Sequence, residues 1–197
     1  MPILAGIVSY FFTKFQRILM AFKNESILLH HLVWYSKVKN VRMKISLWVI
    51  GKTNEKYLET GIGLYLKRIS KYLKFEYTEF RDVKNFSDAA DIKKKEGEMI
   101  LQKLKEEDYL IVLDEAGTHL TSVGFAGFIE KSRVGSSKHM IFLVGGAFGV
   151  HDMVKTKAGL LLSLSNMTFS HQMIRLFFVE QLYRALTIIK NEKYHNP

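Results

Sequence analysis

From residue 43 onward, the apolar and polar residues follow two alternating patterns. Short, nearly continuous apolar runs are typical of strands covered on both faces, and longer stretches with apolar residues three or four positions apart are typical of helices. The runs predict strands at residues 44–50, 75–81, 109–113, 139–144 and 160–164. The longer stretches predict helices at residues 55–72, 88–105, 122–131, 150–155 and 171–190. Strands that alternate with helices indicate an α/β fold, with a mainly parallel sheet sandwiched by helices.

Three of the predicted helices carry recognisable signals. The helix at residues 55–72 is expected to face the core with Tyr57, Leu58, Ile62, Tyr65, Leu66 and Ile69. The helix at residues 88–105 is expected to begin after Ser87 as its N-cap. The last helix has the widest apolar stripe, formed by Met173, Ile174, Phe177, Phe178, Leu182, Leu186 and Ile189. A helix that is apolar on most sides needs a second surface besides its own sheet, which favours a homodimer.

The first 42 residues differ from the rest of the chain. Residues 1–12 are apolar and contain no basic residue, which is the reverse of the order in a signal peptide. No apolar run is long enough to span a bilayer, so no membrane partner is expected. Residues 13–22 could instead form a basic amphipathic helix that touches lipid or RNA. The favoured interpretation is an upstream in-frame start, with residues 1–42 an extension and residues 43–197 the domain.

Composition and charge narrow the class of protein. The 197 residues are 48% hydrophobic, enough for one domain with a real core. The net charge of +10 favours a polyanionic partner, because Lys and Arg that neutralise phosphates release counterions. The chain contains no cysteine, which excludes disulfides, thiolate metal sites and a cysteine nucleophile. That absence is compatible with a reducing cytoplasm.

Two segments near the end of the chain suggest a ligand site. Gly145-Gly146-Ala147-Phe148-Gly149 directly follows a predicted strand, where glycines allow a ligand to approach the backbone closely. The segment matches neither G-x-G-x-x-G nor a P-loop, so a phosphate cradle is not indicated. Residues 164–169 combine a strand end with hydrogen-bonding and flexible apolar side chains. Alternatively, Thr168 or Ser170 in this region caps the last helix.

Several polar residues are candidates for chemistry, each with a simpler alternative. Asp114-Glu115 is a carboxylate pair, but without a neighbouring third ligand a solvated turn is expected and no metal. Arg184 and Glu180 are spaced as a helix-surface ion pair. Arg175 and Arg184 are also candidates to grip RNA phosphate or a target base. Ser170-His171 does not indicate a hydrolase, because the chain has no G-x-S-x-G motif.

The order and spacing of VGGAFG, SLSNMTFSHQMIR, EQLYRA and the final YH resemble the bacterial ribosomal RNA large-subunit methyltransferase H family. The resemblance covers residues 43–197. The family belongs to the SPOUT superfamily, which implies a deep trefoil knot in the C-terminal part. The resemblance also implies methylation of N3 of a pseudouridine in 23S rRNA of the ribosome, with S-adenosylmethionine as methyl donor. A homodimer formed through the last helix is implied as well.

The resemblance assigns roles to particular residues. It implies cofactor contacts at Leu113, Gly145, Gly146, Gly149, Leu164, Ser165, Asn166, Met167, Thr168 and Phe169. Phe148 stands where many relatives have a polar residue. The C-terminal tail is expected to complete the partner's active site, with Arg184 stabilising negative charge and Tyr194 or His195 handling a proton. His171 is the alternative base. The rival interpretations are a non-catalytic RNA- or ribosome-binding protein and a membrane-attached protein that uses residues 1–42.

Overall fold

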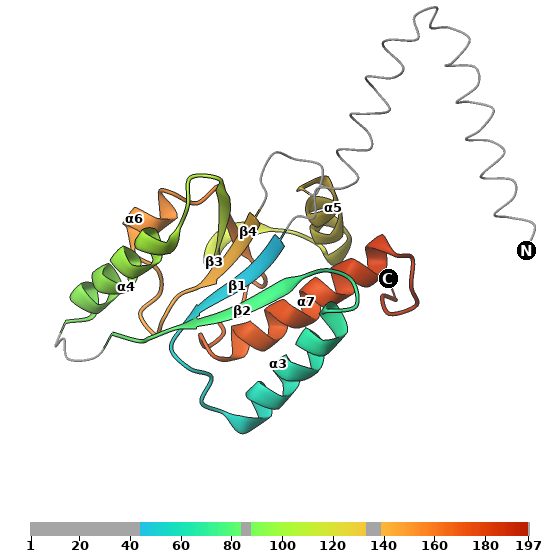
Figure 1. Ribbon diagram of the computed structural model, residues 1–197, viewed down its shortest axis with the longest axis horizontal. Helices are drawn as coiled ribbons and strands as arrows, with labels where there is room; N and C mark the ends of the chain where they lie inside the picture. Colours follow the sequence, from blue (N-terminus) through green and yellow to red (C-terminus); the bar gives the residue numbers. More distant parts are fainter. Residues whose placement is uncertain (1–43, 84–87, 133–138, 197) are drawn as a thin grey trace, which may run out of the picture. The chain divides into compact units, whose positions relative to one another are not determined.

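The computed structural model describes residues 44–83, 88–132 and 139–196. Its five strands are β1 (Lys44–Ile50), β2 (Phe75–Phe80), β3 (Asp108–His119), β4 (His139–Val144) and β5 (Leu160–Ser163). They form one sheet in the order β2-β1-β4-β3-β5, and every neighbouring pair is parallel (Figure 1). The predicted α/β fold is confirmed.

Within the described residues, five helices flank this sheet. They are α3 (Lys56–Ile69), α4 (Ala89–Lys103), α5 (Ser122–Ser132), α6 (Asp152–Lys155) and α7 (Met173–Ile189). Helices α3, α5 and α7 pack on one face, and α4 and α6 pack on the other (Figure 1). Each predicted element is present, with ends that differ by a few residues. No helix among the described residues is long and apolar enough to cross a membrane.

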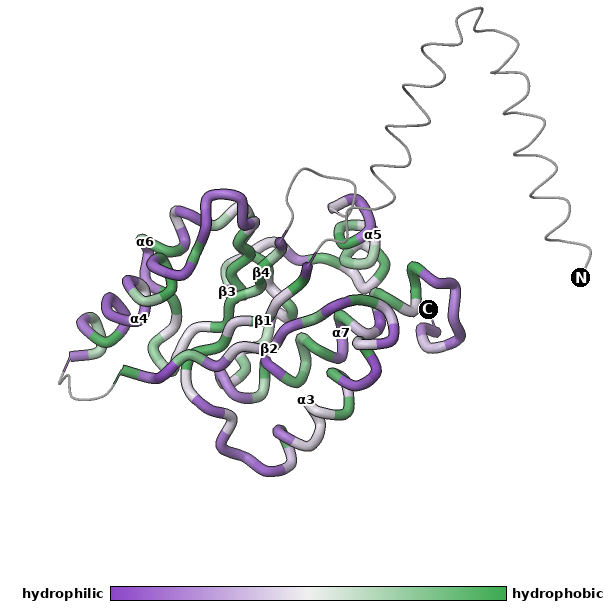
Figure 2. Tube along the Cα trace, in the orientation of Figure 1, coloured by the Kyte–Doolittle hydropathy of each residue, from purple (hydrophilic) through white to green (hydrophobic). Residues whose placement is uncertain are grey.

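Both faces of the sheet carry a core, which explains the continuous apolar runs of the central strands. Ile45, Leu47 and Val49 of β1 face α3, α5 and α7. Trp48 and Ile50 of the same strand face α4 and α6. Figure 2 shows the hydrophobic colour along β3 and β4 in the middle of the sheet. A sheet covered on both sides leaves only its edges for binding, so the strand ends are where a site is expected.

Two details of the predicted helices are wrong. Tyr57 was expected in the core, but its side chain is 60% exposed, because it lies on the outer side of α3 with the exposed Leu64, whereas the neighbouring Leu58 faces the core. The N-cap of α4 is Asp88, whose carboxylate accepts a hydrogen bond from the amide of Ala90 at 3.1 Å. The predicted cap Ser87 lies outside the described residues, as do residues 1–42.

Strand β3 is longer and less regular than predicted. It was expected to end at Leu113, but it continues to His119 with a register shift between Leu113 and Thr118, which both pair with Leu162. Gly117 makes this possible, since a Cβ there would lie 2.6 Å from the backbone of Leu161. The residues between Leu113 and Thr118 bulge out of this register, and Glu115 and Ala116 are exposed to solvent. The predicted turn is therefore a bulge within β3, and its exposure to solvent is confirmed.

A hydrogen-bonded chain ties the amino ends of three strands together. Nε2 of His139 (β4) lies 2.7 Å from the hydroxyl of Ser46 (β1), and its Nδ1 lies 3.0 Å from a carboxylate oxygen of Asp108 (β3). The order Ser-His-Asp matches a hydrolase triad, but Ser46 is fully buried, so no substrate reaches it. Burial lowers the pKa of His139, and the nearby charge of Asp108 only partly opposes this.

This chain makes stability sensitive to acid. Because the folded pKa of His139 lies below its ordinary value of 6.5, the neutral ring stabilises the fold above that pH. The contribution is lost as the pH falls through the lower folded pKa. We expect the free energy of unfolding to fall more steeply between pH 7.5 and 5.5 in the wild type than in His139→Gln, measured by urea denaturation. Equal pH dependence would contradict the assignment, because other titrating groups are shared by both proteins.

Candidate functional site

A cleft of about 810 Å³ opens at the carboxyl ends of β3, β4 and β5. This is where ligands bind in open parallel sheets. Nine of the ten predicted cofactor contacts line it: Leu113, Gly145, Gly146, Gly149, Leu164, Ser165, Met167, Thr168 and Phe169. Asn166 is not among the lining residues. Three segments far apart in the sequence thus meet in one cleft.

The glycine turn after β4 needs each of its glycines for a different reason. Gly149 has a φ of 81°, which favours glycine, and its amide donates to the carbonyl of Gly146 at 3.1 Å. A Cβ on Gly145 would lie 2.7 Å from the side chain of Val150. A Cβ on Gly146 would lie 2.7 Å from Oε2 of Glu96, a buried residue of α4. Close approach of a ligand was the expected reason, but at Gly145 and Gly146 the close packing within the protein already requires glycine.

The loop between β5 and α7 is shaped by its own side chains. The hydroxyl of Ser163 donates to the carbonyl of Ser165 at 2.9 Å, and the hydroxyl of Ser165 accepts from the amide of Met167 at 2.9 Å. The hydroxyl of Ser170 accepts from the amide of Met173 at 3.1 Å. Ser170, rather than Thr168, therefore satisfies the start of α7. Thr168 instead donates to Glu115.

The partners of the charged groups in the cleft were not predicted from the sequence, which indicated Asp114-Glu115 only as a carboxylate pair. Lys155 of α6 forms an ion pair of 2.5 Å with Asp114. Burial by itself would raise the pKa of Asp114, but hydrogen bonds from Lys155 and the amide of Ala116 outweigh it and the pKa is lowered. Glu115 accepts from Thr168 at 2.9 Å. The only sequence signal was that Asp114 directly follows a buried strand. Within residues 44–83, 88–132 and 139–196, no group of three or more metal-ligating side chains is gathered.

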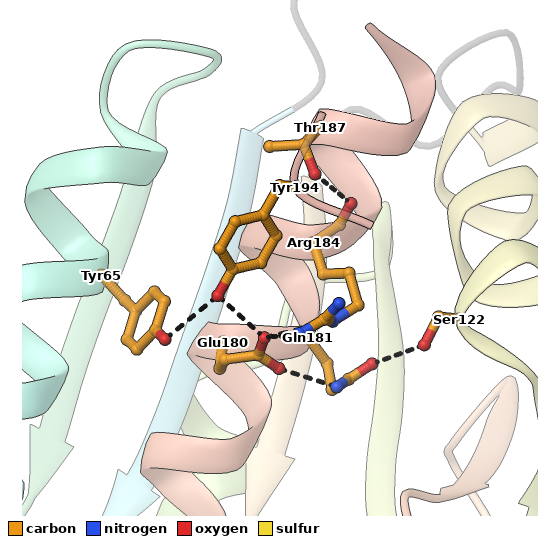
Figure 3. Close-up of polar contacts among 7 residues, drawn as sticks. All are labelled: Tyr65, Ser122, Glu180, Gln181, Arg184, Thr187 and Tyr194. Atoms are coloured by element: carbon orange, nitrogen blue, oxygen red, sulfur yellow. Dashed lines mark hydrogen bonds and ion pairs between the residues drawn. The ribbon is translucent and has the colours of Figure 1, made fainter. Parts of the chain in front are cut away.

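A second cluster lies toward the other end of α7. Arg184 pairs with Glu180 at 2.6 Å, as its spacing predicted, and its guanidinium carbon lies 4.8 Å from the centroid of the Tyr194 ring. The hydroxyl of Tyr194 donates to Glu180 at 3.1 Å and lies 3.2 Å from the hydroxyl of Tyr65 (Figure 3). Burial, followed by Tyr65 and Glu180, raises the pKa of Tyr194. The tail is thus packed against α3 and α7.

His195, the residue after Tyr194, has a ring nitrogen without a hydrogen-bond partner among the described residues. Its Nδ1 is buried and has no hydrogen-bond partner within the described part of the chain. Buried polar atoms are nearly always satisfied, so a water or a group outside the described residues would satisfy this nitrogen.

The candidate catalytic residues are divided between two places. His171 lines the cleft. Burial first, and the charge of Arg175 second, lower its pKa, so its imidazole is neutral at pH 7. Arg184 lies ten residues beyond Ile174 of the cleft wall, about 15 Å along the helix at 1.5 Å per residue. One chain alone therefore does not bring Arg184, Tyr194 and His195 to the cleft.

Arg175 was a candidate to grip RNA, and the structure contradicts this. Its side chain is fully buried. Its guanidinium donates to the carbonyls of Ile50 at 2.6 Å, Gly51 at 3.0 Å and His171 at 2.9 Å. Arg175 therefore joins the end of β1 to the start of α7 and holds His171 beside the cleft.

We expect Arg175→Met to lower the free energy of unfolding by about 3 kcal/mol or more, because it leaves buried carbonyls without a donor. Urea denaturation measures this. Arg184→Met is the matched control, since its partly exposed ion pair is worth about 1 kcal/mol or less. Similar losses in the two variants would contradict the structural role of Arg175.

Comparison with known proteins identifies the family of this chain. A family model described as "Predicted SPOUT methyltransferase" matches residues 43–195. The chain belongs to the SPOUT methyltransferase family. Membership implies a methyltransferase with a methyl donor of the S-adenosylmethionine type. The resemblance stated from the motifs is confirmed.

Individual relatives within the SPOUT family carry one name, ribosomal RNA large subunit methyltransferase H. The protein of that name from Cytophaga hutchinsonii is 50% identical over 155 residues, covering 78% of this chain and 100% of the relative. The Flavobacterium johnsoniae protein is 47% identical over 156 residues, covering 78% and 99%. The Porphyromonas gingivalis protein is 41% identical over 156 residues, with the same coverage.

Proposed function

We propose that this chain methylates N3 of a pseudouridine in 23S rRNA of the large ribosomal subunit, with S-adenosylmethionine as donor. The observation that carries the proposal is the cleft in which the glycine turn, the β5–α7 loop and the end of β3 meet. The family model and the shared name of the relatives support it. Action on ribosomal RNA implies a cytoplasmic protein.

The cleft suits this cofactor, which has no phosphate. The glycine turn exposes backbone amides and carbonyls that match an adenine edge, and Leu113, Leu164 and Ile174 supply apolar walls. Asp114 and Lys155 carry opposite charges, as the ammonium and carboxylate of a methionine group require. When bound, the cofactor supplies the electrophilic methyl group. No metal has a role in the proposed reaction.

We propose that the active site is shared across a homodimer formed through α7. Arg184 lies about 15 Å along α7 from its own cleft, and Tyr194 packs against it, so Arg184, Tyr194 and His195 would serve the partner's cleft. Phe177 of α7 is 41% exposed and packs on Phe169 with ring centroids 4.6 Å apart, which leaves apolar surface for a second subunit.

The reaction requires loss of the N3 proton and alignment of the nitrogen with the methyl group. The Arg184 guanidinium would stabilise the negative charge that develops on the ring. Tyr194 or His195 would handle the proton or position the base. His171 is the alternative acceptor, because it lines the cleft as a neutral imidazole.

We also propose a knot in the C-terminal part of the fold and a boundary for the domain. A deep trefoil knot is proposed because SPOUT membership accompanies three loops, after β3, β4 and β5, that converge on one cleft. We also propose that the working domain is residues 43–197, since the family model begins at residue 43. Residues 1–42 would be an extension without a role in catalysis.

The test uses the purified full-length chain and large-subunit ribosomes that lack this methylation. We expect transfer of labelled methyl from S-adenosylmethionine to N3 of one pseudouridine of 23S rRNA, located by mass spectrometry of digested RNA. Binding of ribosomes without methyl transfer would instead favour the non-catalytic RNA-binding protein. Methylation of another base or atom would contradict the proposed substrate.

A further inference from the structure

A second cavity of about 590 Å³ lies on the other side of the glycine turn. It is bounded by the ends of β1 and β2 and by α4. Gly146, Ala147, Phe148 and His171 line both this cavity and the cofactor cleft. The two cavities therefore adjoin at these four residues, so a base held in the second cavity would lie next to the cofactor cleft, as a methyl acceptor must.

The second cavity contains a buried carboxylate. Glu96 of α4 is 6% exposed, and its two oxygens lie 2.7 and 2.9 Å from where a Cβ on Gly146 would stand. Burial, and then the charge of Asp82, raise its pKa to about 6, while an amide hydrogen bond from Val83 opposes them. Glu96 is thus ionised at pH 7. A carboxylate has about four acceptor positions, so it accepts further hydrogen bonds beside that of Val83.

The rest of the cavity suits a nucleotide. Phe148 is 53% exposed at the shared wall, where its ring offers a face for stacking a base. Lys52 and Arg81 line the cavity and supply positive charge for a phosphate. Glu79 also lines it, but one of its oxygens already accepts from the amide and hydroxyl of Thr53, at 3.0 and 3.1 Å. Of the three carboxylates that line the cavity, Glu79, Asp82 and Glu96, it is Glu96 whose oxygens lie against Gly146 of the shared wall.

We propose that the second cavity receives the target nucleotide and that Glu96 selects pseudouridine over uridine by accepting a hydrogen bond from ring N1–H. This inference rests on the proposed function. Pseudouridine is joined to its ribose through carbon, so N1 keeps a hydrogen, whereas N1 of uridine is bonded to the ribose. Both bases carry N3–H, so N1–H is the distinguishing donor. An ionised carboxylate only accepts hydrogen bonds, and a site built around such a bond discriminates strongly against a base that lacks the donor.

The test compares full-length wild type, Glu96→Leu and Glu96→Gln on two kinds of ribosome, with pseudouridine or uridine at the target position. We expect wild type to prefer pseudouridine. In Glu96→Leu, kcat/KM should fall roughly 10- to 100-fold on pseudouridine ribosomes and change little on uridine ribosomes, since a hydrogen bond to a charged group is lost. Glu98→Gln is the matched control on α4, because Glu98 pairs with Lys95 at 2.8 Å outside both cavities.

Calorimetry of S-adenosylmethionine binding separates recognition from folding. Both Glu96 variants should bind the cofactor as wild type does. Glu96→Gln keeps the side-chain volume and has the weaker acceptor, so it should show a smaller loss of selectivity and carries the test if Glu96→Leu does not fold. An unchanged pseudouridine-to-uridine ratio in a variant that binds the cofactor would overturn this inference alone. A wild type that methylates neither ribosome would overturn the proposed function and this inference together.

Discussion

Gly146→Val is expected to weaken S-adenosylmethionine binding by about 100-fold, the equivalent of roughly 3 kcal/mol of overpacking. A Cβ at this position would lie 2.7 and 2.9 Å from the carboxylate oxygens of Glu96. Glu96 is buried, so the turn would have to move away from α4 and into the cofactor cleft. Isothermal titration calorimetry of the purified full-length proteins measures the change.

Gly127→Val on α5 is the matched control, because a Cβ on Gly127 has nothing within 4 Å. It should bind the cofactor like wild type. Melting temperatures of both variants identify any general loss of folding. Wild-type affinity in a folded Gly146→Val protein would show that this turn does not form the cofactor site.

The second large effect is expected from subunit mixing. Gly146→Val should disable the cleft, and Arg184→Ala should disable the cluster with Tyr194, so each protein should be nearly inactive alone. In a mixed dimer, the intact cleft of one subunit would meet the intact cluster of the other. With random exchange, half of the dimers are mixed and one of their two sites is restored, so activity should recover to about a quarter of wild type.

The C-terminal tail packs against the same helix that carries Arg184. Tyr194 hydrogen-bonds to Glu180, which also binds Arg184, so these residues belong to one cluster in one chain. Mixing Arg184→Ala with a chain truncated after Lys193 should therefore restore nothing. No recovery with Gly146→Val, in mixed dimers verified by native mass spectrometry, would argue that the cluster serves its own subunit.

Local patterns were enough to predict the elements and the loops that line the cleft. Strands β1 and β4 begin and end at the predicted residues, because a strand buried on both faces is a continuous apolar run whatever its neighbours. The glycine turn and the β5–α7 loop follow apolar strands directly, so parallel topology brings both to one edge of the sheet. Two of the four family motifs, VGGAFG and SLSNMTFSHQMIR, lie in these same segments.

What the sequence alone determined is thus the α/β class, the order of elements and the segments that line the cleft, since each depends on spacing within a short stretch. Only the tertiary structure decided which polar side chains meet. Asp114 pairs with Lys155 and Glu96 abuts Gly146 across different elements, and no periodicity encodes such contacts. Arg175 and Arg184 lie on one helix, yet one is buried under carbonyls and the other stacks on Tyr194. Their roles differ because the neighbours of a helix position come from distant parts of the chain.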